Sequence, residues 1–298
     1  MPALSDRLQE GALELAWSLW AELGVSGWRR RHVSHAIDPE PLILFTAFLG
    51  DTDPRLRDEA TDWCIGYGRY VSAVRLRNLL SKALPEERRA FGPFAATINA
   101  HSTLRWPGST DPRQYQRTGR ARIPDFARPS LVVLRCRALF GVGARAEILR
   151  TYLSDSSSSL SAADLAHVVG YTKRNVADAL EALKMGGLLE VIPQRNQLRY
   201  RSARTSELAD LVGDLPGDFP NWRSIFRILE TMLSTARRTE GLNPSVRGVE
   251  AARALHELTD DMRLAGLKAP PFADAGEAWA RFESWAVVTT EAWASAAV

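Results

Sequence analysis

The stretch that most constrains the fold is GYTKRNVADALEALKMGGLLEV, residues 170–191. Val176, Leu180 and Leu183 fall at positions i, i+4 and i+7, so a helix beginning near residue 173 buries one apolar stripe. Thr172 stands at the N-cap position, and the pair Gly186-Gly187 ends the helix as a left-handed C-cap would. The residues that follow predict two short strands, 188–192 and 198–201, around a turn.

A second helix is expected immediately before this one. Ser161 begins SAADLAHVV and Asp164 follows three residues later, which is an acidic variant of the capping box. Ala166 allows close approach of two helices, Gly170 tolerates the positive φ of a tight turn, and Val176 gives the second helix a compact apolar contact. Helix, tight turn, helix and hairpin are therefore expected in that order.

Residues 144–201 resemble the winged helix-turn-helix DNA-binding domains of bacterial transcriptional regulators of the ArsR, MarR and GntR kind. In such domains the first turns of the second helix enter the major groove, and the wing reaches phosphates or the minor groove. Asp178 and Glu181 depart from the pattern, because carboxylates on the outward helix face repel phosphate, although they can accept from cytosine N4. The resemblance implies seven DNA-binding residues: Thr172, Lys173, Arg174 and Asn175 in the groove, and Arg195, Arg199 and Arg201 on the wing.

The whole sequence predicts a mainly α fold with the winged helix-turn-helix and its short β-hairpin wing at the centre. Residues 101–128 interrupt the helical pattern with Pro and Gly and carry six arginines, which predicts a surface loop or an arm along a phosphate backbone. We expect four parts: an N-terminal helical domain (1–100), an Arg-rich linker or arm (101–128), the winged helix-turn-helix domain (129–203) and a C-terminal helical bundle (204–298).

Further helix starts are marked by cap residues. Asp53 precedes Pro54, Asn221 precedes a long amphipathic helix, and Ser245 precedes residues 246–266. Cys64 and Cys136 both lie in apolar segments and are expected to be buried free thiols, a disulfide between them being the alternative.

The net charge of +3 is unevenly distributed along the chain. Residues 1–142 carry 20 Lys and Arg against 15 Asp and Glu, and residues 143–203 carry 8 against 6. Residues 205–298 carry 9 against 14, a net charge of −5. A basic front and middle suit a polyanionic partner, whereas the acidic end, which also holds large apolar side chains, is expected to mediate association as a homodimer.

The function expected from these features is that of a cytoplasmic, sequence-specific regulator of transcription that binds double-stranded DNA. The alternative is a protein-interaction module, or an antitoxin-like component, whose winged helix and helical flanks bind a protein partner. No signal peptide and no membrane-spanning stretch are predicted. No Gly-rich phosphate loop, metal-ligand spacing or nucleophile motif is present, so we expect no catalytic residues, no metal and no cofactor.

Overall fold

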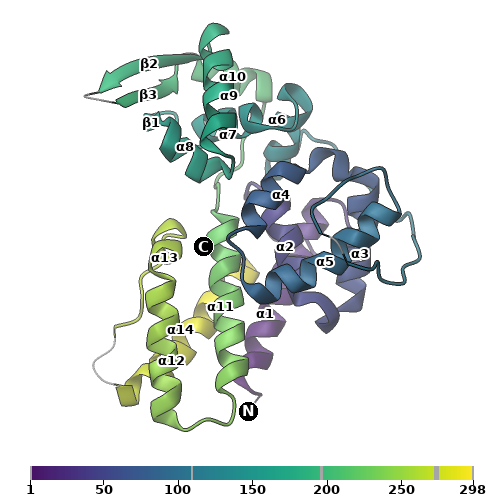
Figure 1. Cartoon of the computed structure of the whole chain (residues 1–298), viewed down its shortest axis with the longest axis vertical. Helices are drawn as coiled ribbons and strands as arrows, with labels where there is room; N and C mark the ends of the chain where they lie inside the picture. Colours follow the sequence, from purple (N-terminus) through teal and green to yellow (C-terminus); the bar gives the residue numbers. More distant parts are fainter. Residues whose placement is uncertain (1, 109, 195–196, 272–274, 297–298) are drawn as a thin grey trace.

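The structure is a computed structural model that describes residues 2–108, 110–194, 197–271 and 275–296. The described residues form fourteen α-helices and one three-stranded antiparallel sheet, which confirms the expected mainly helical fold (Figure 1). Five helices lie in the first hundred residues: α1 (Leu4–Glu22), α2 (Pro39–Leu49), α3 (Pro54–Tyr67), α4 (Ala73–Leu80) and α5 (Pro85–Ala100). Three short 3-10 helices accompany the α-helices, at Gly50–Thr52, Gly68–Tyr70 and Pro129–Leu131.

The middle of the chain contains all three strands. Its elements in chain order are α6 (Val132–Phe140), α7 (Ala144–Ser154), β1 (Leu160–Ser161), α8 (Ala162–Val169), α9 (Lys173–Met185), β2 (Leu189–Gln194), β3 (Gln197–Ser202) and α10 (Thr205–Val212). Strand β3 lies at the centre of the sheet, between β1 and β2. Tyr200 on β3 is opposite Leu160 on one side and Val191 on the other.

The last third of the chain is helical throughout. Its elements are α11 (Trp222–Thr239), α12 (Pro244–Glu257), α13 (Thr259–Leu264) and α14 (Ala275–Ser295). The expected cap at Ser245 is wrong: α12 begins at Pro244, and Asn243 accepts the capping hydrogen bond from the backbone N–H of Val246. An Asn followed by Pro supplies both a side-chain acceptor and a first helical residue that needs no N–H partner, so this pair outcompetes the serine.

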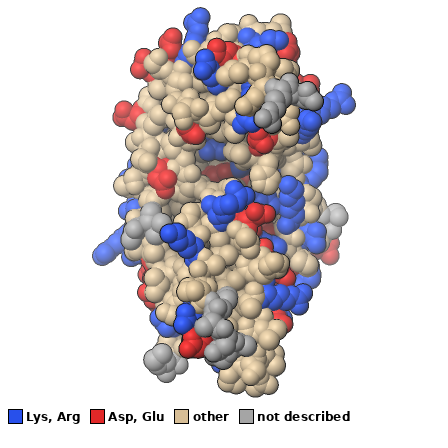
Figure 2. Space-filling model, turned by 90° about the vertical axis from the view of Figure 1, so that its left-hand side faces the viewer, with Lys and Arg blue, Asp and Glu red and all other residues tan. Residues whose placement is uncertain are grey.

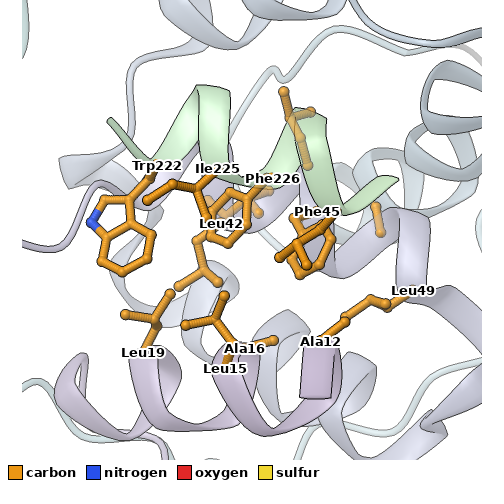
Figure 3. Close-up of a cluster of buried hydrophobic side chains, with 14 of the residues drawn as sticks. Ala12, Leu15, Ala16, Leu19, Leu42, Phe45, Leu49, Trp222, Ile225 and Phe226 are labelled. Carbon is orange, nitrogen blue, oxygen red and sulfur yellow. The ribbon is translucent and has the colours of Figure 1, made fainter. Parts of the chain in front are cut away.

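Helices from the two ends of the chain share one apolar core. Helix α1 packs against α14 and α11, and α11 also packs against α2. Figure 3 shows Leu15 and Leu19 of α1 facing Phe45 of α2 and Phe226 of α11, and the rings of Phe45 and Phe226 stack with centroids 4.4 Å apart. Large apolar residues of the last third of the chain, such as Phe226, therefore pack against the first hundred residues, and α14 also packs against α12.

A second core lies within the middle segment and is formed mainly by buried residues of helices α6 to α10 and of strand β2. The first core still takes in Trp106 and Ala121 of the loop after α5 and Leu134 of α6, and the chain returns to it at α11 (Figure 1). The loop before α6 is held against α3 by the Asp62 carboxylate, which accepts from the Tyr115 hydroxyl and from three backbone N–H groups, of Thr118, Gly119 and Ala121. Cys64 and Cys136 are buried free thiols, which confirms that expectation.

Candidate nucleic-acid interface

The turn between α8 and α9 has the geometry that its sequence predicts. Ser161 accepts from the backbone N–H of Asp164, and the Asp164 carboxylate accepts in return from the backbone N–H of Ser161, which completes the capping box. Gly170 has a φ of +72°, and a Cβ added there would lie 3.3 Å from Nε of Arg75. Both the positive φ and this close approach favour glycine. Val176 is fully buried, as its place on the inner face of α9 requires.

Helix α9 buries one face and exposes the other. Its buried residues are Val176, Ala179, Leu180 and Leu183, and its exposed residues include Lys173, Arg174, Ala177, Asp178, Glu181 and Lys184. Lys184 forms an ion pair with Glu181 at 3.4 Å. Within the described part of the chain, Lys173 and Arg174 have no ion-pair partner. The outward face is therefore most positive at the N-terminal turn.

Thr172 and Asn175 are brought together by the capping of α9. The Thr172 hydroxyl oxygen accepts from the backbone N–H of Asn175, which confirms Thr172 as the N-cap. The same hydroxyl donates to Oδ1 of Asn175. Both side chains therefore stabilise the start of the helix, and Lys173 and Arg174 are the long side chains that extend from this turn.

The described wing arginines contact other residues of their own region. Nε of Arg199 donates to the carbonyl oxygen of Ser159 at 2.8 Å, which joins β3 to the residue before β1. Arg201 pairs with Glu190, its cross-strand neighbour on β2. Arg195, the third predicted wing residue, lies outside the described residues. Neither Arg199 nor Arg201 is joined to the first turn of α9.

The turn between α8 and α9 is fastened to α4, a contact that no local sequence pattern predicts. Nε of Arg75 donates to the carbonyl of the last α8 residue at 3.0 Å, and the side-chain amide of Asn78 donates to the carbonyl of Gly170 at 3.1 Å. The Tyr171 hydroxyl donates to Oγ of Ser72 at 2.7 Å. These hydrogen bonds fix the start of α9 relative to the first core.

A buried network of charges reinforces this junction. Arg137 of α6 donates to both carboxylate oxygens of Glu40 on α2, at 2.7 and 2.8 Å, and to Glu147 on α7, at 2.6 and 2.8 Å. Arg75 binds Glu40 and Asp38 from the other side. Burial lowers the pKa of the Arg137 guanidinium, but the Glu147 and Glu40 carboxylates outweigh it, so that the pKa is raised and the charge retained.

Comparison of the chain with family models, with curated proteins and with solved structures found no match. Among the described residues, no helix is long and apolar enough to cross a bilayer.

Proposed function

We propose that this chain is a sequence-specific DNA-binding regulator of transcription, and that α7 to β3 act as a winged helix-turn-helix. The support is the chain order of helix, strand, helix, helix, strand, strand, combined with a sheet in which the third strand lies between the first two. This arrangement fits the domain that residues 144–201 resemble. Strands β2 and β3 form the wing, and α9 is the recognition helix.

The observation that carries the proposal is the composition of the two faces of α9. Its apolar residues are buried, while its first turn presents to solvent two cations, Lys173 and Arg174, that have no ion-pair partner among the described residues. A helix of this length is roughly 20 Å long, and a helix fits the major groove of B-DNA, which is about 12 Å wide. Arg174 is assigned the base contact, because its guanidinium can donate to both O6 and N7 of guanine, and Lys173 the phosphate contact.

The two carboxylates on the outer face limit how far α9 enters the groove. Asp178 and Glu181 are exposed, and the pairing of Glu181 with Lys184 neutralises only one of them. Repulsion from phosphate therefore restricts the contact to the first turn unless a carboxylate faces a cytosine N4 donor. One short contact per chain gives little specificity, so we propose that a homodimer binds two half-sites.

The wing has a smaller role in this proposal. Arg199 and Arg201 would contact phosphates, but each already has a partner within the protein, Ser159 and Glu190 respectively. Only the exposed Arg201 can exchange its partner for a phosphate at small cost, because an exposed ion pair contributes about 0–1 kcal/mol.

The experiment is a fluorescence-anisotropy titration of the full chain against a duplex from upstream of its own gene and against a random duplex, at two salt concentrations. Arg174→Ala should cost about 1–3 kcal/mol on the specific duplex and less on the random one. Lys184→Ala, which removes a paired cation from the other end of α9, is the matched control and should leave the discrimination unchanged. Equal losses on both duplexes for Arg174→Ala would reduce it to a phosphate contact.

A protein-interaction module, of the antitoxin-like kind for example, is the second candidate. The outer face of α9 favours this function, because its three cations and two carboxylates leave it close to neutral. The wing arginines Arg199 and Arg201 favour it as well, because both already have partners within the protein. A chain that binds neither duplex even at low salt would favour this function, because phosphate contacts alone support non-specific binding there.

A further inference from the structure

A cleft of about 660 Å³ lies beside the α8–α9 turn, between the turn and the start of α11. Its walls come from the ends of α4 and α7, from α8 and the turn that follows it, from the start of α11 and from α13. Figure 2 shows a recess across the middle of the corresponding face, with basic and acidic side chains in and around it. Sites for small molecules occupy about 300–1,000 Å³, so the cleft has the size of such a site.

The two ends of the cleft differ in chemistry. Phe219, Trp222 and Leu264 line both the cleft and a smaller cavity of about 170 Å³. Lys82, Arg223 and Arg227 line the part of the cleft that adjoins a narrow pocket between α2, α4, α5 and α11. Trp222 and Arg227 are five residues apart on α11, a separation of about 7.5 Å along the helix axis. The cleft therefore offers an apolar end and a cationic end within the length of one small molecule.

The three cations at this end differ from the other basic residues of the cleft. Arg75, Arg150 and Arg263 each form an ion pair, with Asp38 and Glu40, with Glu147 and with Asp260 respectively. For Lys82, Arg223 and Arg227 there is no carboxylate oxygen within 4 Å in the described part of the chain. Nη1 of Arg227 is buried and has no hydrogen-bond partner there. Such a donor costs free energy until a partner occupies the cleft.

Two nearby carboxyls line the narrow pocket beside these cations without forming an ion pair with them among the described residues. Glu87 of α5 and Glu230 of α11 are both buried, and burial raises the pKa of each, although Arg223 and Arg227 act in the opposite direction. The pKa of Arg223 is lowered, first by burial and further by the like charges of Arg75 and Arg227, against the pull of Glu87 and Asp261. A bound anion would relieve this repulsion.

We propose that the cleft binds a small molecule that carries a phosphate or pyrophosphate group on an apolar or aromatic body. Lys82, Arg223 and Arg227 hold the anionic group, because guanidinium and ammonium donors suit phosphate oxygens. Phe219 and Trp222 contact the body. The volume and the separation of the two ends suit a mononucleotide or a metabolite of similar size.

This ligand would also reach the start of α9. Gly170, Tyr171 and Thr172 line the cleft, so a molecule that touches them and α11 favours one position of α9 relative to the first core. If α9 binds DNA as proposed above, the ligand changes the affinity for DNA. The size of the change is set by how much more tightly the ligand binds the chain with α9 in the favoured position than with α9 in another position. This regulatory step rests on the proposed function, whereas binding of the ligand does not.

The test is isothermal titration calorimetry of the full chain, without DNA, with inorganic phosphate, pyrophosphate, ATP, GTP and pyridoxal phosphate as probes. We expect saturable binding of at least one organic phosphate, tighter than that of inorganic phosphate. The double substitution Arg223→Gln and Arg227→Gln should weaken it by about tenfold or more, since hydrogen bonds to charged groups are among the strong ones. Lys82→Gln, at an exposed position, should weaken it by several-fold.

Arg253→Gln is the matched control, because Arg253 lies on the exposed face of α12, away from the cleft, and pairs with Glu257. It should leave binding unchanged. Absence of saturable binding by every probe would overturn the proposal, and so would binding that survives both Lys82→Gln and the double substitution. Repeating the DNA titration with the bound probe then tests regulation. A chain that binds the probe but no DNA would contradict the proposed function and leave the ligand site standing.

Discussion

Replacing Arg137 by methionine should destabilise the protein strongly, because it removes the centre of the buried charge network. The guanidinium makes two hydrogen bonds to Glu40, two to Glu147 and one to the carbonyl oxygen of Tyr70, all between 2.6 and 2.8 Å. Its side chain has no exposed area. Removing one partner of a buried ion pair typically costs about 3–5 kcal/mol, since the other charge is left without compensation.

The remaining contacts place Arg137→Met at the lower end of that range. Glu40 keeps Arg75 at 2.6 Å, and Glu147 keeps Arg150 at 3.1 Å, so neither carboxylate is left alone. We therefore expect a loss of about 3 kcal/mol in the free energy of unfolding, a large share of the roughly 5–15 kcal/mol that stabilises a typical domain.

Urea denaturation followed by tryptophan fluorescence and by circular dichroism measures this loss. Arg253→Met, which breaks an exposed pair on α12, is the control and should change stability by about 0.5 kcal/mol or less. The double variant Arg137→Met and Glu147→Gln should lose less free energy of unfolding than the sum of the losses of the two single variants, because both residues belong to one network. A loss below about 1 kcal/mol for Arg137→Met would refute the assignment of this network as the fastening between the two cores.

Three further predictions concern the turn, pH and the shared core. Gly170→Ala should destabilise by about 1 kcal/mol or more, since alanine is strained at this positive φ and its Cβ would press on Arg75; chemical denaturation that shows no loss would contradict this. Burial lowers the pKa of His32 from 6.5 to about 4 despite its hydrogen bond with a backbone carbonyl, so the stability from neutral His32 is present above pH 6.5 and lost as the pH falls toward 4. Between pH 7 and pH 4 the free energy of unfolding of the protein should fall by about 3 kcal/mol more than that of its His32→Gln variant. Parallel profiles of unfolding free energy against pH would contradict this. A chain ending at residue 205 should be insoluble, because the partners of α11 in the first core would be exposed; a soluble truncated chain in light scattering would show that this core is not shared.

Local features of the fold were predictable from the sequence, because each depends on neighbouring residues alone. The caps at Asp53, Ser161, Thr172 and Asn221 are confirmed by side-chain hydrogen bonds to the first turn of each helix. The positive φ at Gly170 is confirmed as well. The expected strands 188–192 and 198–201 are found as the slightly longer β2 and β3. Strand β1 was missed, since two residues in a serine-rich stretch carry no alternation.

Features that join distant parts of the chain were not predictable. An apolar stripe shows that a helix is buried but does not name its partner, so the packing of α1 against α14 and α11 left no trace in the sequence. The partners Glu40 and Arg137 are 97 positions apart, and nothing local distinguishes them from surface charges. For the same reason the sequence suggested wing arginines free to contact DNA, while the described ones, Arg199 and Arg201, have partners within the protein.

The most direct test of the account is selection of bound sequences from a random pool of double-stranded DNA by the purified full chain. If α9 reads bases through its first turn, successive rounds should enrich a short motif, and a homodimer should enrich it as two half-sites about 10 base pairs apart or a multiple of that spacing. The Lys173→Ala and Arg174→Ala double variant should fail to enrich the motif at the same salt concentration. A pool that stays random with the unaltered chain, or the same motif enriched by the double variant, would contradict the claim that α9 is a recognition helix.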